Sequence, residues 1–297
     1  MKKAKLFKIV LIVLVAIIAV RMLLEPKESN SRFKGFNKSD IVKLKSGLAD
    51  TMMNVDDVAA LLSNKKIILA GESHFVIEPQ EYFTRLVSKL NDKPAVLLLE
   101  VSSKSQEDIN SYLSTGDEKY LNKVFKEGNN LPLDYIVKWA FNNKERVKKV
   151  IAYDQSPFQI ILNRVFLNDT RNESMAEAVF SAFKENPDAR IYAYGGGMHM
   201  LKNGRYRYDS ATRETILPRL KKMGVPETVI ENIMLSGSKR FPLDTLWQKP
   251  GAIKMDSELG RMPYEYFIDY PVFGIKTAGE AYDIFINLGS LTDIVKR

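Results

Sequence analysis

The residues best suited to chemistry in this chain are two histidines and three carboxylates that follow short apolar segments. His74 stands two residues after Glu72, and His199 follows a run of three glycines. Glu100 and Asp154 each come directly after a further apolar segment. An imidazole beside a carboxylate is suited to general acid–base catalysis, because the carboxylate orients the ring and stabilises its charged form. These five residues are therefore the candidate site, provided that the fold brings them together.

The four apolar segments that precede these residues are typical of buried strands. They are 67–70, 95–99, 150–153 and 190–194. Each is continuous rather than alternating, which predicts strands buried on both faces of a mostly parallel sheet. Helical patterns over 79–90, 106–143 and 170–184 lie between them, and this alternation predicts an α/β fold in which helices flank a central sheet. Because parallel strands end at one edge of the sheet, we expect the candidate residues to converge there.

The remaining segments predict an elaborated domain over 39–297. The stretch between the second and third strands is too long for a simple crossover, so we expect a helical insertion at about 104–146. After Gly204 the pattern predicts a helix over 212–222 and a loop over 241–263. We also expect late strands at 271–275 and 282–288, and either a strand or a buried turn at 229–235.

Arg171 is a further candidate for the catalytic group. It lies in the first turn of a predicted helix, where Thr170 and Glu173 form a capping-box pattern. The positive charge of an arginine is unfavourable there, because it opposes the helix dipole. One interpretation is that Arg171 faces the site and binds a carboxylate or a developing oxyanion. The alternative is an ordinary solvated arginine.

Glycines and an aspartate complete the candidate site as substrate-binding groups. Gly196 and Gly197 permit close approach of the backbone, and we expect their N–H groups to face an anion. The alternative is a flexible turn. Asp154 is expected to contact the substrate, although an acidic residue after a strand is often only a turn former.

Composition excludes several classes of protein. The 297 residues include no cysteine, which excludes a thiolate nucleophile, a disulfide scaffold and cysteine-ligated metal centres. Ser73 is the remaining candidate for a covalent nucleophile, and no Gly-x-Ser-x-Gly elbow surrounds it. The net charge of +8 is concentrated at the N-terminus, where the first 32 residues hold seven basic and two acidic residues. No nucleic-acid partner is therefore expected.

The first 25 residues are predicted to anchor the chain in a membrane. Four lysines precede an apolar run, and residues 6–24 would span about 28 Å as a helix. The lysines place the N-terminus in the cytoplasm. We therefore expect a single-pass signal anchor over 1–25, a linker over 26–38, and a domain exported to the periplasm or the cell exterior. A cleaved secretory signal is the alternative, although 19–21 is a poor cleavage site.

The motifs at the predicted strand ends resemble a known superfamily, which joins erythromycin esterases, ChaN-like haem-binding proteins, and the TraB and Tiki proteins. The similar pieces occur in a consistent order over about residues 60–290. They are G-E-S-H at 71–74, Glu100, R-N-E-S-M-A at 171–176, the glycines before His199, and A-Y-D-I-F-I at 281–286. The first motif is closer to the ChaN-like pattern, since erythromycin esterases place one more residue between Glu and His and a glycine where this chain has Phe75.

The resemblance implies an α/β fold and one shared active site. The residues it implies are Glu72, His74, Glu100, Arg171 and His199. Its members differ in chemistry, because the ChaN group is associated with haem and the Tiki group with metal-dependent peptidase activity.

The leading hypothesis is a hydrolase that attacks an ester or amide of a small molecule or peptide with an activated water. His74 would be the general base, oriented by Glu72 or Glu100. His199 and Arg171 would stabilise the oxyanion or protonate the leaving group. No cofactor is required for this chemistry.

Two alternatives use some of the same residues. In the first, His74, His199 and Glu72, with Glu100 or Asp154, hold a divalent metal ion of a peptidase. In the second, the protein binds haem without hydrolysis. Its axial ligands would then come from Tyr192, Tyr194, Met198 or His199.

Overall fold

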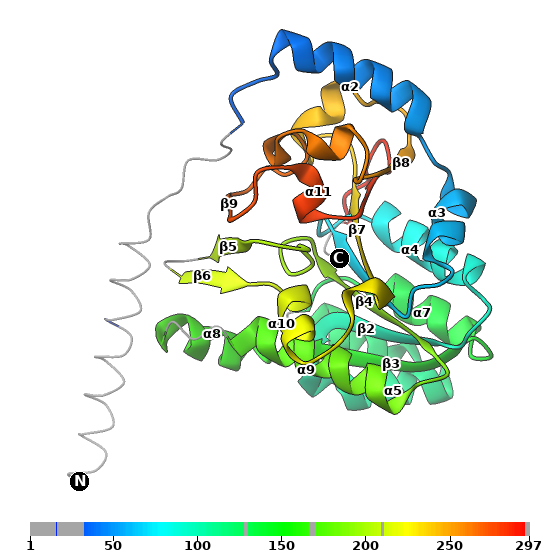
Figure 1. Cartoon of the computed structure of the whole chain (residues 1–297). Coiled ribbons are helices and arrows are strands. Elements are labelled where there is room, and N and C mark those ends of the chain that lie inside the picture. Colours follow the sequence, from blue (N-terminus) through cyan, green and yellow to red (C-terminus); the bar gives the residue numbers. More distant parts are fainter. Residues whose placement is uncertain (1–15, 17–32, 128–129, 167–169, 209–210, 295–297) are drawn as a thin grey trace.

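A seven-stranded sheet organises the chain, with strand order β3-β2-β4-β1-β7-β10-β8 (Figure 1). Its strands are β1 (Ile67–Glu72), β2 (Ala95–Ser102), β3 (Val147–Asp154), β4 (Arg190–Gly196), β7 (Ile230–Ser236), β8 (Gly251–Lys254) and β10 (Ile284–Asn287). All neighbouring pairs are parallel except β8 and β10, which are antiparallel. The predicted α/β class and the mostly parallel sheet are thus confirmed.

This computed structural model describes residues 33–127, 130–166, 170–208 and 211–294, together with residue 16. The predicted membrane anchor at 1–25 lies outside the described residues, apart from residue 16, and so does the first part of the predicted linker. Within the described ranges, no helix is long and apolar enough to cross a membrane.

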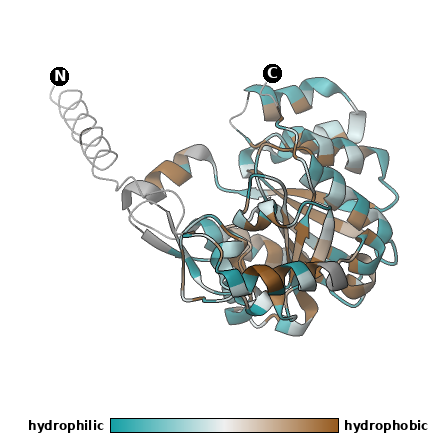
Figure 2. Cartoon of the chain, turned by 90° about the horizontal axis from the view of Figure 1, so that it is seen from above, coloured by the Kyte–Doolittle hydropathy of each residue, from teal (hydrophilic) through white to brown (hydrophobic). Residues whose placement is uncertain are grey.

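Helices cover both faces of the sheet. One face packs against α3 (Val55–Leu62), α4 (Glu78–Lys89), α5 (Gln106–Thr115) and α7 (Asp134–Asn142). The opposite face packs against α9 (Thr170–Glu185) and α10 (Ile216–Lys222). Successive side chains of a strand point to opposite faces, so Leu97 and Leu99 join the first core while Val96 and Leu98 join the second. Figure 2 shows these hydrophobic strands in the interior, between more hydrophilic outer helices.

The predicted helical insertion at 104–146 corresponds to a chain of helices that connects β2 to β3. It comprises a 3₁₀ turn (Ser103–Ser105), α5, α6 (Glu118–Asn122), a π-helical turn (Lys123–Glu127) and α7. Ile109, Val124 and Ile136 from these elements are buried against the first face of the sheet. The segment therefore forms part of the helical layer.

The C-terminal third differs most from the sequence-based expectation. The predicted helix at 212–222 begins only at Ile216, because its first part forms β6 (Ala211–Glu214) in a small sheet with β5 (Arg205–Tyr208) and β9 (Val272–Phe273). The predicted loop at 241–263 contains β8, which pairs with β10. A third core joins this region to α2 (Lys38–Thr51). The other helices are α8 (Pro157–Phe166), α11 (Ala278–Ala281) and four 3₁₀ turns, at Glu227–Val229, Pro242–Thr245, Leu259–Arg261 and Tyr264–Tyr266.

The carboxyl ends of the central strands meet at one edge of the sheet. β4 lies between β1 and β2, and Glu72 is the register partner of Gly196. The residues that end β1, β2 and β3 therefore surround the end of β4 and the turn that carries His199.

Candidate active site

Glu72 and His74 form a hydrogen-bonded pair at the end of β1. The Nδ1 atom of His74 lies 2.8 Å from Oε1 of Glu72. The other oxygen of this carboxylate accepts a hydrogen bond from the Tyr194 hydroxyl at 2.6 Å. Because a carboxylate only accepts, Nδ1 of His74 carries the proton, and the neutral ring presents an unprotonated Nε2. The His74 side chain is 32% exposed, whereas Glu72 is buried, so the ring is the accessible member of the pair.

Two carboxylates raise the proton affinity of His74. Burial alone favours the neutral ring, but the hydrogen bond with Glu72 and the charges of Glu100 and Glu72 outweigh it. The pKa of His74 is therefore raised to about 8. At neutral pH the ring is mostly charged, and it becomes a proton acceptor as the pH approaches and passes 8.

Glu100 connects the remaining groups of the site. Its Oε2 accepts the backbone N–H of Gly196 at 2.6 Å, and its Oε1 accepts Nη2 of Arg171 at 2.7 Å. Oε1 also lies 3.5 Å from Nε2 of His199. Burial raises the pKa of Glu100, but His199, His74, Arg171 and the Gly196 N–H together lower it to about 2. This buried carboxylate is therefore ionised at neutral pH.

Arg171 is held by two carboxylates rather than by solvent. Its Nε and Nη2 donate to the two oxygens of Asp154 at 2.8 and 2.7 Å, while Nη2 also reaches Glu100. This bidentate pair explains how a cation is tolerated in the first turn of α9. Asp154 is thus engaged by the arginine, whereas the sequence had suggested direct contact with a substrate.

His199 lies in the turn after β4 and is 4% exposed. Its Nδ1 is hydrogen-bonded to the side-chain oxygen of Asn172 and lies 3.2 Å from the Tyr206 hydroxyl. Burial lowers the pKa of His199 to about 3, and the nearby positive charge of Arg171 adds to this effect against the attraction of Glu100. The two histidines therefore differ in charge at neutral pH, although they share one edge of the sheet.

The glycines of this edge are required by close packing. A Cβ atom at Gly196 would lie 2.7 Å from Nε2 of His74, and one at Gly195 would lie 2.5 Å from Oε2 of Glu100. The N–H groups predicted to face an anion instead donate within the protein, from Gly196 to Glu100 and from Gly197 to the backbone carbonyl of Glu72. The glycines thus allow the side chains of His74 and Glu100 to approach the backbone.

The metal alternative does not fit the described side chains. They contain no group of three or more His, Asp or Glu residues arranged to hold a metal ion. Glu72 is hydrogen-bonded to His74 and Tyr194, and Glu100 is hydrogen-bonded to Arg171.

Two of the suggested haem ligands lie in the core. Tyr192 and Tyr194 are fully buried and pack against Phe83 of α4. Met198 is partly buried against the C-terminal core. His199 lies at the site, and its Nδ1 is hydrogen-bonded to Asn172.

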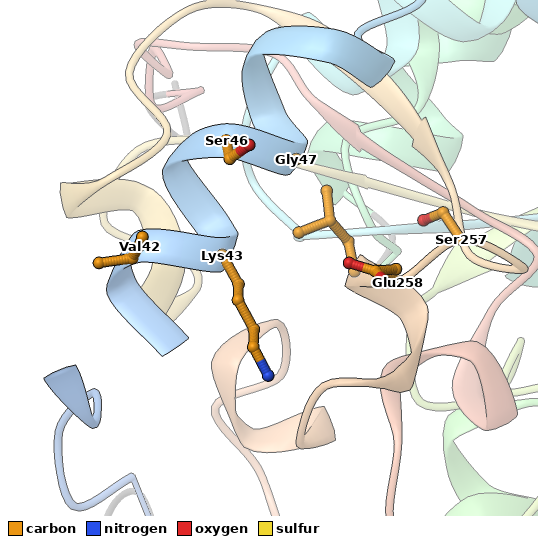
Figure 3. Close-up of a pocket in the computed structure, with 7 residues that line it drawn as sticks. Val42, Lys43, Ser46, Gly47, Ser257 and Glu258 are labelled. Atoms are coloured by element: carbon orange, nitrogen blue, oxygen red, sulfur yellow. The ribbon is translucent and has the colours of Figure 1, made fainter. Parts of the chain in front are cut away.

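A separate surface cavity does not involve the candidate site. It has a volume of about 410 Å³ and lies between α2 and the loop around Glu258 (Figure 3). Its walls are Val42, Lys43, Ser46, Gly47, Ser257, Glu258 and Leu259. None of these residues belongs to the cluster at the ends of β1, β2, β3 and β4.

Comparison with solved structures identifies the fold. No family model matches the sequence, and no curated protein matches it significantly. A mutant of erythromycin esterase EreC in its open conformation aligns with a TM-score of 0.60 at 11% identity, covering 82% of this chain and 98% of that one. The chain has an erythromycin esterase-like fold. A succinoglycan biosynthesis protein gives a TM-score of 0.64 at 10% identity, with 87% of this chain and 100% of that chain covered.

A protein from Bacillus cereus shares the erythromycin esterase-like fold as well. Its TM-score is 0.55 at 13% identity, covering 87% of this chain and 99% of that one. At such low identities the likeness establishes the fold, and the chemistry has to be argued from the side chains.

Three residues of the site were not identified from the sequence. Tyr194 was considered only as a possible haem ligand, yet its hydroxyl donates a hydrogen bond to Glu72. Asn172 was part of a recognised motif without a role of its own. Tyr206 follows the turn in β5 and carried no signal in the sequence, because its proximity to His199 arises from the small sheet.

Proposed function

We propose that the protein is a membrane-anchored hydrolase of esters or amides, in which His74 activates a water molecule as general base. The observation that supports this most directly is the Glu72–His74 pair, in which the carboxylate engages Nδ1 while the His74 side chain remains 32% exposed. Nε2 makes no hydrogen bond to any residue in the described part of the chain. A base held in one tautomer by a carboxylate is the arrangement that proton abstraction from water requires.

Water is a better nucleophile for this site than the neighbouring serine. The Ser73 hydroxyl lies 3.4 Å from the hydroxyl of Ser236 on β7, and no hydrogen bond joins it to His74 or His199 among the described contacts. A serine nucleophile needs a base within hydrogen-bond reach. In the proposed reaction, His74 takes a proton from water, the resulting hydroxide attacks the carbonyl carbon, and His74 returns the proton to the leaving alcohol or amine. Arg171 would stabilise the negative charge that develops on the carbonyl oxygen.

The test is a screen of the full-length chain against aryl esters and short peptides. Replacement of His74 by Gln should lower kcat/KM by about 10²–10⁴-fold, which is the usual contribution of general acid–base catalysis. Glu231→Gln is the matched control, because Glu231 is a largely buried carboxylate near the opposite edge of the same sheet. Full activity in His74→Gln, or equal loss in both variants, would contradict the assignment.

The alternatives give different results in the same preparation. A haem-binding protein would show a Soret band on addition of haem, and His199→Gln would remove it. A metal-dependent peptidase would contain a divalent ion by elemental analysis and lose activity with chelators. Hydrolysis that persists with chelator present and without haem supports the water mechanism.

Membrane anchoring and export of the domain belong to the same proposal and rest on residues 1–25. The expected result is that the full-length chain remains in the membrane fraction after alkaline extraction. An added protease should reach the domain from outside the cytoplasmic membrane. Recovery in the soluble cytoplasmic fraction would contradict this part.

A further inference from the structure

The side-chain amide of Asn172 has only one chemically acceptable orientation. Its Nδ2 atom lies 2.7 Å from the backbone carbonyl of Glu214, which can only accept a hydrogen bond. The NH₂ group must therefore face Glu214, where it also lies 3.1 Å from the Tyr206 hydroxyl. Asn172 is fully buried, so water does not compete for these contacts. The Oδ1 atom is consequently the one that faces His199.

This orientation determines where His199 carries its proton. Oδ1 of Asn172 is an acceptor, so Nδ1 of His199 must be the donor. The ring is also fixed in position by its backbone, because the His199 N–H donates to the carbonyl of Gly196 and the His199 carbonyl accepts the N–H of Ile216. In the neutral ring the second nitrogen, Nε2, then holds a lone pair, and it lies 3.5 Å from Oε1 of Glu100.

We propose that Asn172 is a positioning residue that holds His199 in the Nδ1-protonated tautomer, so that Nε2 presents a hydrogen-bond acceptor at the catalytic edge. Without Asn172, the adjacent Glu100 carboxylate would favour the opposite tautomer, with the proton on Nε2. Asn172 thus keeps the proton on Nδ1 of His199, although the charge of Glu100 alone would favour Nε2. Burial supports this assignment, because it keeps the ring neutral at the pH where His74 is charged.

The consequence for the reaction rests on the proposed function. A neutral His199 with this tautomer has no Nε2 proton to give, so it does not protonate the leaving group or donate to an oxyanion in the resting site. Instead it accepts one O–H of the attacking water while His74 removes the other proton. Donation to the oxyanion then falls to Arg171.

The tautomer is measurable without any substrate, because the chain has only two histidines. NMR spectra of the ¹⁵N-labelled full-length chain that correlate the imidazole nitrogens with the ring C–H protons should show two histidine rings. The signals of His74 are assigned as those that disappear in His74→Gln. At pH 7 the His199 ring should show a protonated Nδ1 and an unprotonated Nε2. A protonated Nε2 in the wild-type protein, with or without a protonated Nδ1, would overturn the proposal.

Variants of Asn172 test the cause. Asn172→Leu should move the proton of His199 to Nε2, beside Glu100, and an unchanged tautomer there would contradict the inference. Asn172→Asp keeps an acceptor, so it should retain the Nδ1 proton and raise the pH at which the ring becomes doubly protonated. If the Leu variant does not fold, the wild-type and Asp spectra still decide the question.

Two control variants test whether the effect on His199 is specific to Asn172. Comparison with the activity screen then distinguishes this positioning role from the hydrolase hypothesis. Asn186→Asp changes another buried asparagine of the same segment, whose Nδ2 donates to the carbonyl of Ala182, and it should leave the His199 spectrum unchanged. Tyr206→Phe should also retain the Nδ1 proton, since Asn172 still accepts it. An inactive chain with the expected spectrum would refute the hydrolase but not the positioning role, whereas an active chain with an Nε2 proton would refute the positioning role alone.

Discussion

The Nδ1 atom of His74 lies 2.8 Å from Oε1 of Glu72, and Tyr194 donates to the second oxygen of the same carboxylate. The carboxylate is therefore fixed from one side by the core and fixes the exposed ring on the other. This relationship sets both the tautomer and the proton affinity of His74. It is the basis of the first prediction.

The rate of hydrolysis should rise with pH through a midpoint near 8. The pKa of His74 is raised to about 8, and only the neutral ring accepts a proton, so the active fraction grows as the pH increases past that value. The measurement is kcat/KM between pH 6 and 9.5 for an ester found in the screen. Glu72→Gln removes the main stabiliser of the charged ring and should move the midpoint to lower pH. A midpoint that is the same in both proteins would argue against this pair.

Arg171 should contribute strongly to stability. Its removal in Arg171→Ala leaves Glu100 and Asp154 without their cation, although both carboxylates are at least nine-tenths buried. Loss of one partner from a buried ion pair typically lowers the free energy of unfolding by about 3–5 kcal/mol. Urea denaturation checks this value.

Arg240 provides the comparison for Arg171. It pairs with Asp293 at 3.0 Å on the surface, where the two side chains are 40% and 78% exposed. Arg240→Ala should therefore lower the free energy of unfolding by less than about 1 kcal/mol. Equal losses in the two arginine variants would show that the buried cluster has no special role in stability.

Gly196→Ala should reduce activity more than it reduces stability. The added Cβ atom would lie 2.7 Å from Nε2 of His74, so the ring would have to shift away from its present position. Displacement of a catalytic group by about 1 Å can cost about 10²-fold in rate. The test compares kcat/KM and thermal denaturation with Gly251→Ala on β8, where the new methyl group would meet the flexible side chain of Met52 at 3.2 Å. Normal activity in Gly196→Ala would disprove the close approach.

Acid should destabilise the protein partly through His199. Burial lowers its pKa to about 3, from an unfolded value near 6.5. Below pH 6.5 the unfolded chain binds a proton that the folded chain does not, so the free energy of unfolding falls as the pH drops toward 3. In urea denaturation experiments, the free energy of unfolding of His199→Gln should decrease less over this pH range than that of the wild-type protein. The same slope in both proteins would mean that His199 is already charged in the fold.

Local patterns in the sequence were sufficient to predict the first four strands of the sheet and the residues at their carboxyl ends. Continuous apolar runs predicted β1 to β4, because strands buried on both faces need no polar alternation. The same argument placed Glu72, Glu100 and Asp154 at the carboxyl edge, where they lie. It failed for β6 and β8, whose short segments become strands only by pairing with β5 and β10. β8 pairs with residues about 30 positions later in the chain, and β6 pairs within a short hairpin, so neither strand needs the continuous apolar run of a buried strand.

The sequence by itself determined the chemical inventory of the protein: no thiol, two imidazoles, and carboxylates at the ends of parallel strands. Only the tertiary structure decided how these groups share protons. Asn172 meets His199 across 27 positions of the chain, and Arg171 meets Glu100 across 71. Proton position and charge depend on contacts within a few ångströms and on burial, and both arise only after the helices have packed on the sheet.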